Sequence, residues 1–228
     1  MEGYFPVLLR LEDKPCLVVG GGSVAERRIA SLLEARAKVK VVSPEMTETI
    51  GLWAREGRIE ALQRPYLPED QAGMYLVIAA TDNASVNDRV LELARRHNRA
   101  VNMAERPELG DFIVPSVVRR GKLVIAVSTL GASPTVAASV RRQIEACFGE
   151  EYETYLDFLS EFRLRTQEQV QDTRLRQELY RSVLQENVLE KIKNGEFEEW
   201  KSRIMSQMGN PHPSVPASTS GGKACAKL

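Results

Sequence analysis

The stretch CLVVGGGSVA, residues 16–25, decides the fold of this chain. Its first four residues are apolar and rich in branched side chains, as in a strand that is buried on both faces. Residues 25–35 then repeat apolar side chains at helical spacing. A buried strand that leads into a helix through three glycines is typical of the phosphate-binding turn of a dinucleotide site.

Each small residue of the pattern Gly-x-Gly-x-x-Ala has its own expected role. We expect Gly20 to form the tight turn, Gly22 to let a pyrophosphate approach the backbone, and Ala25 to allow close helix packing. The phosphates would face the free N–H groups of the helix N-terminus. A turn that binds nothing is the alternative, but the flanking strand, the helix and a second strand at 38–42 favour nucleotide binding.

The end of the second strand bears on the choice of cofactor. Sites that take NAD usually place Asp or Glu there, whereas this chain has Ser43, followed by Pro44 and Glu45. We expect Glu45, or backbone groups of Ser43 and Pro44, to meet the ribose. No Arg or Lys follows this strand until Arg55, which favours NAD over NADP.

The composition indicates a globular chain without a strong charge preference. A chain of 228 residues with 43% hydrophobic content has enough apolar side chains for a core. Its 31 basic and 31 acidic residues argue against general attraction to nucleic acid or membrane surfaces. Three scattered cysteines without metal-ligand spacing suggest a reducing compartment. With no signal peptide and no apolar run of about 18 residues, we expect a soluble, cytoplasmic protein.

Residues 1–113 are predicted to form an α/β domain, a Rossmann-type parallel sheet that binds NAD. Strands are expected at 16–19, 38–42, 59–63, 75–80 and 100–103, and helices at 25–35, 45–56 and 84–97. Strands that alternate with helices indicate a parallel sheet covered on both faces.

The rest of the chain is predicted to form three further segments. Residues 114–149 are expected to be a small α+β segment: a strand at 112–114 leads into it, a second strand follows at 123–127, and a helix opens at Ser133 and Pro134. Residues 150–208 read as a helical domain with an apolar stripe of Tyr155, Phe158, Leu159 and Phe162. Residues 209–228 are rich in Pro, Ser and Gly and are expected to be disordered.

Two loops should face the same crevice as the glycines, because ligands of open α/β sheets lie at the carboxyl ends of the strands. After the fourth strand, Thr81 is the better candidate for a cofactor contact, whereas Asp82 and Asn83 read rather as a turn and helix cap. After the fifth strand, Glu105 is either an acid–base group or a solvated loop carboxylate.

A third loop, residues 128–134, carries hydroxyl groups and free N–H groups that suit an anion. We expect an acidic ligand there, bound by basic residues that are nearby in the sequence. The alternative is that these basic side chains are exposed to solvent and bind no ligand. These residues are Arg119, Arg120, Lys122, Arg141 and Arg142.

Three segments together resemble the precorrin-2 dehydrogenase family, which includes the dehydrogenase/ferrochelatase part of siroheme synthase. They are FPVLLRLEDKPCLVVGGGSVAERR at 5–28, IAATDN at 78–83 and VNMAERPELGDFIVPSVVRRGKLVIAVSTLGASP at 101–134. The resemblance runs from about residue 4 to residue 148 and continues weakly through the helical region.

The resemblance implies NAD-dependent oxidation of precorrin-2 to sirohydrochlorin, for siroheme or cobalamin, by a homodimer whose segment 114–149 exchanges contacts between subunits. Some members also insert Fe²⁺ or Co²⁺ into sirohydrochlorin, which would add a lyase activity. Two alternatives stay open: a chelatase only, or an NAD-binding regulatory module without catalysis. The sequence itself shows no Cys/His cluster for a resident metal.

The resemblance also assigns roles to single residues. Its cofactor contacts fall on Gly22, Ser23, Val24, Pro44 and Glu45, and its substrate hydroxyls on Ser128 and Thr129, beside Arg119, Arg120 and Arg141 as basic residues that suit an acidic substrate.

Two positions depart from the family pattern. The catalytic Asp of the family is replaced by Glu105, one methylene longer, where a misplacement of about 1 Å can cost on the order of 100-fold in rate. Asp111 is the second candidate for this role. Arg36 stands where relatives usually have Gly, at the end of a predicted helix.

Overall fold

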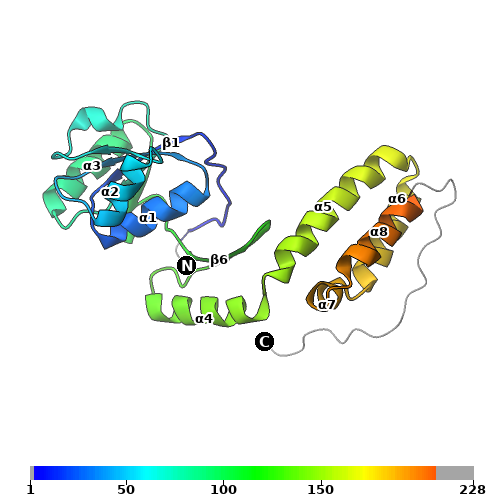
Figure 1. Cartoon of the computed structure of the whole chain (residues 1–228). Coiled ribbons are helices and arrows are strands. Elements are labelled where there is room, and N and C mark those ends of the chain that lie inside the picture. Colours follow the sequence, from blue (N-terminus) through cyan, green and yellow to red (C-terminus); the bar gives the residue numbers. More distant parts are fainter. Residues whose placement is uncertain (1–2, 209–228) are drawn as a thin grey trace. The chain divides into compact units, whose positions relative to one another are not determined.

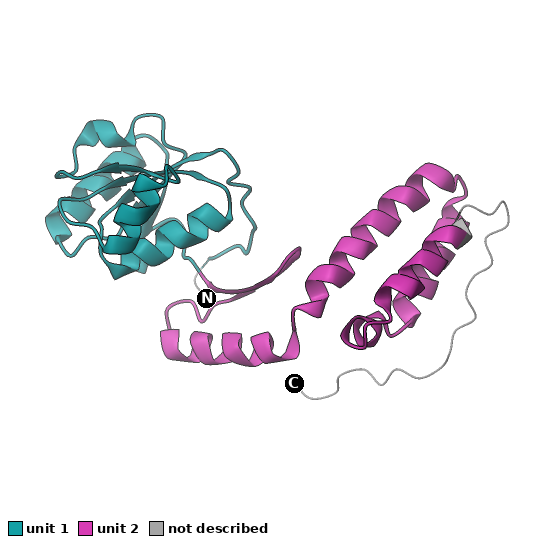
Figure 2. Ribbon diagram, viewed as in Figure 1, with its two compact units in different colours: residues 1–114 teal, residues 115–228 magenta. Residues whose placement is uncertain are grey.

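The computed structural model describes residues 3–208 and divides the chain into two compact units, Met1–Val114 and Pro115–Leu228 (Figure 2). The expected disordered tail, residues 209–228, lies outside the described residues.

Unit 1 contains a five-stranded parallel sheet in the order β3-β2-β1-β4-β5. Figure 1 labels its strand β1 and the helices α1, α2 and α3 of the same unit. The central strand β1 pairs with β2 on one side, Cys16 opposite Val39, and with β4 on the other, Cys16 opposite Leu76. Both faces of the central strands are buried, as their apolar sequences predict. The strands are β1 Pro15–Val19, β2 Lys38–Val42, β3 Glu60–Leu62, β4 Leu76–Ala79 and β5 Ala100–Met103.

Helices cover both faces of this sheet. Helix α1, Ser23–Glu34, and helix α2, Glu48–Arg55, bury Ile29 and Ile50 against one face. Helix α3, Ala84–Arg96, buries Val90 and Leu91 against the other. Two short 3-10 helices, η1 Pro68–Gln71 and η2 Pro107–Leu109, complete the unit. The predicted Rossmann-type α/β fold is therefore confirmed.

Unit 2 begins with a two-stranded antiparallel sheet, β6 Ser116–Arg120 and β7 Leu123–Val127. Helix α4, Pro134–Cys147, follows, and the Ser133 hydroxyl accepts a hydrogen bond from the Val136 N–H at 3.3 Å, so this residue caps the helix as predicted. Four further helices are α5 Glu151–Gln169, α6 Thr173–Gln185, α7 Val188–Lys193 and α8 Phe197–Met208.

The helical part of unit 2 has its own aromatic core. Phe158 of α5 lies edge-on to Trp200 of α8, with ring centroids 4.9 Å apart, and both side chains are buried. Phe162 belongs to the same core, and Tyr155 and Leu159 pack against it. The predicted apolar stripe of α5 is confirmed.

The predicted strand at 112–114 is wrong. Pro115 has no backbone N–H to donate to a sheet, and the β-strand begins only at Ser116. The preceding segment lies along β5 instead, where the Asp111 N–H donates to the Val101 carbonyl at 2.8 Å and the Asn102 side chain donates to the Phe112 carbonyl at 2.8 Å. The helix expected at 45–56 begins later than predicted, at Glu48, because the Thr47 hydroxyl caps it by accepting the Ile50 N–H.

Among residues 3–208, no helix combines the length and the apolar content that crossing a lipid bilayer requires.

Arg36 occupies a backbone position that suits glycine. Its φ is +57°, and the N–H groups of Arg36 and Ala37 donate to the carbonyls of Leu33 and Leu32, which is a Schellman end of α1. A left-handed conformation costs a residue with a Cβ roughly 1–2 kcal/mol, and the greater freedom of glycine in the unfolded chain offsets part of this.

We therefore predict that Arg36→Gly raises the free energy of unfolding by about 0.5–1 kcal/mol in a denaturant titration. Ala35→Gly is the matched control, because Ala35 has a φ of −82° and should lose stability on the same change. A destabilised Arg36→Gly variant would show that the Arg36 side chain, which lies 3.4 Å from Glu12, contributes more than the strain costs.

Candidate functional site

A cavity of about 850 Å³ lies at the carboxyl edge of the sheet in unit 1. Residues that follow β1, β2, β4 and β5 line it, which is where ligands of open α/β sheets bind. The structure brings every residue predicted to contact the cofactor into this lining: Gly20, Gly22, Ser23, Val24, Ser43, Pro44, Glu45 and Thr81. Glu105 lines the same cavity.

The three glycines of the turn have different surroundings. Gly20 has a φ of +124°, and a Cβ there would lie 2.2 Å from the Ala80 carbonyl oxygen. A Cβ on Gly21 would lie 2.0 Å from the Glu45 carbonyl oxygen, whereas one on Gly22 would meet no atom within 4 Å. Packing thus requires the first two glycines. The third leaves open space at the cavity wall, as a pyrophosphate close to the backbone needs.

The N-terminus of α1 faces this space without a side-chain cap. Gly22 is the N-cap residue, and among the described residues no side chain caps the first turn there. The Glu26 N–H donates to the Gly22 carbonyl at 2.9 Å, so the N–H groups of Ser23 and Val24 precede the first helical hydrogen bond. Free N–H groups and the helix dipole suit an anion at this position.

The loop after β2 is held beside the glycine turn. The Thr47 N–H donates to the Gly21 carbonyl at 3.0 Å, and the Thr47 hydroxyl donates to the Glu26 carboxylate at 2.6 Å. Ser43 is buried, while Pro44 and Glu45 are exposed toward the cavity that they line. These contacts fix the residues predicted to meet the ribose next to those predicted to meet the phosphates.

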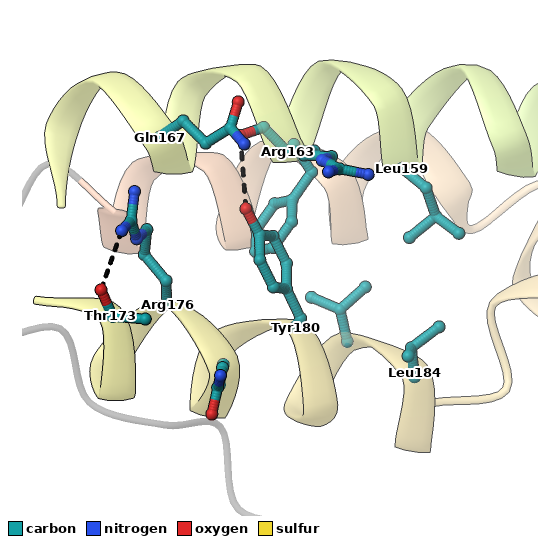
Figure 3. Close-up of a pocket in the computed structure, with 10 residues that line it drawn as sticks. Leu159, Arg163, Gln167, Thr173, Arg176, Tyr180 and Leu184 are labelled. Atoms are coloured by element: carbon teal, nitrogen blue, oxygen red, sulfur yellow. Dashed lines mark hydrogen bonds between the residues drawn. The ribbon is translucent and has the colours of Figure 1, made fainter.

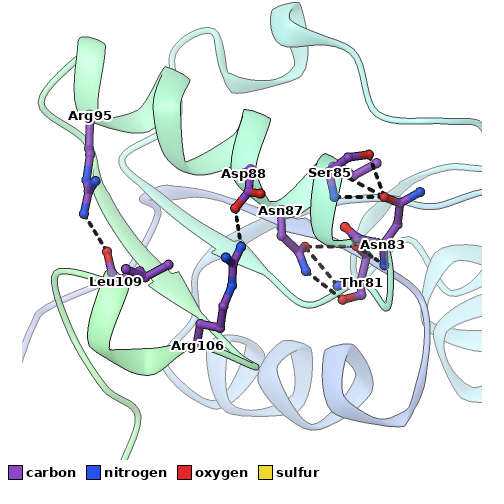
Figure 4. Close-up of polar contacts among 9 residues, drawn as sticks. Thr81, Asn83, Ser85, Asn87, Asp88, Arg95, Arg106 and Leu109 are labelled. Carbon is purple, nitrogen blue, oxygen red and sulfur yellow. Dashed lines mark hydrogen bonds and ion pairs between the residues drawn. The ribbon is translucent and has the colours of Figure 1, made fainter.

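The loop after β4 is closed by its own hydrogen bonds (Figure 4). The Thr81 hydroxyl donates to the Asn87 side-chain oxygen at 2.9 Å and accepts from the Asn83 N–H at 3.1 Å. The Asn83 side chain caps α3 by accepting from the N–H groups of Ser85 and Val86, as the cap reading predicted. Thr81 lines the cavity, but its hydroxyl is engaged within the loop, so a cofactor contact through it stays a prediction.

The loop that carries Glu105 is anchored to its neighbours. The Ala104 N–H donates to the Ala79 carbonyl of β4 at 2.9 Å. The Arg106 guanidinium pairs with Asp88 of α3, and Arg95 of the same helix donates to the Leu109 carbonyl at 2.9 Å (Figure 4). No described residue pairs with the Glu105 carboxylate. It is an exposed group on a fixed loop, as an acid–base group at a cavity rim would be.

Asp111, the second candidate carboxylate, has a structural partner. Its side chain accepts the Val101 N–H of β5 at 2.9 Å, and its own N–H donates to the Val101 carbonyl. Asp111 does not belong to the cavity lining. The geometry therefore favours Glu105 over Asp111.

The hydroxyls predicted to meet the substrate organise their own loop in unit 2. The Ser128 hydroxyl accepts the Leu130 N–H at 3.1 Å. The Thr129 hydroxyl donates to the Ser133 carbonyl at 3.0 Å and accepts the Ser133 N–H at 3.2 Å. These bonds shape the loop before α4, and a substrate contact remains a prediction.

Among the arginines predicted to meet the substrate, Arg120 and Arg141 form ion pairs that can be named by their partners. Arg120 contacts Glu150 at 3.2 Å, and Arg141 contacts Glu145 at 2.6 Å, one helical turn away. Arg119 is exposed on β6. An acidic substrate would have to compete with these carboxylates for Arg120 and Arg141.

A second cavity, of about 500 Å³, lies between α5 and α6 (Figure 3). Leu159, Arg163, Tyr180 and Leu184 are among the residues that line it. None of the residues singled out from the sequence as a site residue belongs to this lining.

The cysteines found in the described part of the chain do not form a metal site. Cys16 is fully buried in β1, and burial raises the pKa of its thiol to about 11, so it is a core residue as predicted. Residues 3–208 contain no group of three or more His, Cys, Asp or Glu side chains placed to hold a metal ion.

The structure adds residues that the sequence reasoning missed. Gly21 stood between the two glycines given roles, and only its close approach to Glu45 shows why it is glycine. Tyr66 and Arg89 line the cavity from beyond β3 and from α3. Val86 and Arg89 are three residues apart and therefore lie on the same face of the predicted helix. This spacing was a sequence signal that Arg89 faces the same side as Val86.

Comparisons with known proteins agree with this site. Residues 7–116 match a family model described as putative NAD(P)-binding, and residues 120–146 match one described as sirohaem biosynthesis protein central. The siroheme synthase of Nitrosococcus oceani is 39% identical over 196 residues, which cover 86% of this chain and 42% of that protein. The siroheme synthase of Methylobacillus flagellatus is 38% identical over 210 residues, 91% of this chain and 45% of that protein.

A solved structure described as SirC, precorrin-2 dehydrogenase, has the same fold. It superposes with a TM-score of 0.74 at 27% sequence identity and covers 89% of this chain and 100% of its own. The chain spans less than half the length of the two siroheme synthases, whereas it spans the whole of this dehydrogenase. The chain therefore belongs to the family that comprises precorrin-2 dehydrogenase and the corresponding part of siroheme synthase.

Proposed function

We propose that this chain oxidises precorrin-2 to sirohydrochlorin with NAD⁺ in siroheme biosynthesis. The single observation that carries the proposal is the cavity of unit 1, which combines an open glycine turn with Glu105, a carboxylate that pairs with none of residues 3–208. The relatives named siroheme synthase and precorrin-2 dehydrogenase support the choice of substrate. The NAD(P)-binding family model supports a nicotinamide cofactor.

NAD⁺ is proposed over NADP⁺ because of the residues at the end of β2. Ser43, Pro44 and Glu45 line the cavity there, and Glu45 is a carboxylate. A carboxylate accepts the hydroxyls of a ribose and repels an added 2′-phosphate.

The reaction removes one hydride and one proton from the tetrapyrrole, so that precorrin-2 and NAD⁺ give sirohydrochlorin, NADH and H⁺. When bound, the nicotinamide ring supplies the hydride acceptor. The free N–H groups of Ser23 and Val24 hold the phosphates, and the glycine turn excludes side chains from that space. The Glu105 carboxylate accepts the proton as a general base.

The substrate is proposed to meet unit 2 through Ser128, Thr129 and the arginines Arg119, Arg120 and Arg141. Precorrin-2 carries many carboxylates, and guanidinium groups bind carboxylates in bidentate geometry. We also propose that the protein is cytoplasmic and that it forms a homodimer. The exposed apolar side chains of Val117 in β6 and Val136 in α4 support the dimer. Analytical ultracentrifugation tests this: a species of single-chain mass at micromolar concentration would overturn the dimer.

We also propose a second step, the insertion of Fe²⁺ or Co²⁺ into sirohydrochlorin, in which the metal is a substrate. Removing the pyrrole protons needs a base, and Glu105 is an exposed carboxylate in the lining of the cavity.

The experiment that tests the proposal mixes purified protein with NAD⁺ and precorrin-2 and follows the absorption of the tetrapyrrole. Conversion to the sirohydrochlorin spectrum is expected, with none when NAD⁺ is omitted. If NAD⁺ binds but the spectrum never changes, the chain is a nucleotide-binding module and not a dehydrogenase. A second sample with sirohydrochlorin and Fe²⁺ or Co²⁺ identifies a chelatase that lacks the dehydrogenase step.

A further inference from the structure

The cavity of unit 1 extends beyond the residues assigned to phosphate, ribose and catalysis. Past the end of β2 it is lined by Pro65 and Tyr66, which follow β3, and by Val86 and Arg89 of α3. Tyr66 is buried, and its hydroxyl accepts a hydrogen bond from the Gln71 side chain at 2.9 Å. This end of the cavity is therefore a fixed wall with apolar surfaces and one cation.

Of the described residues that line this cavity, Arg89 is the one with a basic side chain. The other charged lining residues, Glu45, Asp82 and Glu105, are all acidic. Within residues 3–208, Arg89 has no ion-pair partner, whereas Arg96 of the same helix pairs with Glu92 at 2.6 Å. Its charge lies close enough to Tyr66 to oppose the rise in pKa that burial imposes on that phenol.

Arg89 belongs to α3, which follows β4, and it shares the cavity lining with Tyr66, close enough for its charge to act on that phenol. The glycine turn follows β1, Glu45 follows β2, and Pro65 and Tyr66 lie beyond β3, at the edge of the sheet opposite to β5 and Glu105. With the phosphates at the glycine turn and the nicotinamide toward Glu105, the adenosine half extends toward Pro65, Val86 and Arg89. This step rests on the proposed function.

We propose that Arg89 stacks its guanidinium on the adenine ring of the dinucleotide, with Pro65 and Val86 as the apolar walls of the adenine slot. A planar guanidinium stacks well on aromatic faces, and purines bind arginine in this way. The alternative partner, a 2′-phosphate, is opposed by Glu45 at the same end of the cavity. The pyrophosphate already has the free N–H groups of α1.

The test measures binding of fragments of the cofactor to Arg89→Met by isothermal titration calorimetry. Stacking at an exposed site is worth about 0.5–1 kcal/mol, so the affinities for NAD⁺, ADP-ribose and AMP should each fall about 2- to 5-fold. Nicotinamide mononucleotide should bind as it does to the unchanged chain. Arg96→Met is the matched control, because it removes an arginine of the same helix outside the cavity, and it should change none of these affinities.

Arg89→Lys separates stacking from charge, because lysine keeps the charge but lacks the planar group. A loss similar to that of Arg89→Met is expected. Full AMP affinity in Arg89→Lys would overturn stacking in favour of simple charge attraction. An Arg89→Met variant that loses NADPH affinity more than NADH affinity would overturn it in favour of a 2′-phosphate contact.

The binding and activity measurements distinguish a wrong adenine contact from a wrong proposed function. If the unchanged chain binds NAD⁺ and converts precorrin-2 while Arg89→Met binds every fragment normally, only the adenine contact is wrong. If the unchanged chain binds no dinucleotide, both fail.

Discussion

Gly22→Asp is expected to weaken NAD⁺ binding at least about 100-fold while the fold stays intact, because a like charge forced next to a phosphate costs several kcal/mol. The fold tolerates the change because Gly22 has a φ of −82° and open space around its Cβ position. The new carboxylate would occupy the space that the pyrophosphate needs. Fluorescence titration with NADH measures the affinity, and thermal unfolding measures the stability.

Alanine substitutions of the three glycines provide the controls. Gly22→Ala should fold normally and lose less affinity than Gly22→Asp, because a methyl group adds bulk without charge. Gly20→Ala and Gly21→Ala should destabilise the fold itself, since each Cβ would clash with a carbonyl oxygen, at 2.2 Å and 2.0 Å. NAD⁺ affinity that survives Gly22→Asp would place the phosphates elsewhere.

Glu105→Gln should lower kcat by about 100- to 10,000-fold, the usual contribution of a general base, while NAD⁺ affinity changes little. Glutamine keeps the size and the polarity of the side chain but cannot take up a proton at neutral pH. The fold should be unaffected, because no described residue pairs with the Glu105 carboxylate. Steady-state kinetics with precorrin-2, alongside NADH titration, separates turnover from cofactor binding.

Asp111→Asn is the matched control for the carboxylate. The asparagine oxygen can still accept the Val101 N–H that Asp111 now accepts at 2.9 Å, so turnover should be retained. An active Glu105→Gln enzyme together with an inactive Asp111→Asn enzyme would reverse the assignment. Glu105→Asp, which restores the residue that the family resemblance implies, should retain activity.

Much of the fold of unit 1 could be predicted from local patterns. The strands at 38–42 and 100–103 have the predicted bounds, because each is a short, valine-containing segment between two helical segments, which leaves little freedom in where the strand begins and ends. The segment 112–114 was misread because its apolar, branched residues look like a strand. Its partner, the edge of β5 with the Asn102 side chain, is a long-range contact that no local pattern shows.

The sequence predicted those site residues that directly follow a strand, because the end of the strand fixes where they lie. Gly22, Glu45, Thr81 and Glu105 all come within a few residues of a strand that ends at the carboxyl edge, and all line one cavity. The choice between Glu105 and Asp111 was beyond the sequence, because it depends on the direction of each side chain and not on spacing.

The far end of the cavity was also beyond local reasoning. Tyr66 reaches it after β3, at the edge of the sheet, and Arg89 reaches it from the side of a helix. Neither residue lies in a motif with a characteristic spacing, so only the packing of α3 against the sheet brings them together with the glycine turn.

The central claim is that this chain moves a hydride from precorrin-2 to NAD⁺, and simultaneous measurement of both products tests it most directly. Stopped-flow absorption of the purified protein with NAD⁺ and precorrin-2 should show NADH and sirohydrochlorin appearing at the same rate and in equal amounts, with Glu105→Gln slow in both. Loss of precorrin-2 without an equal yield of NADH, or no change in either spectrum while NAD⁺ is bound, would contradict the account.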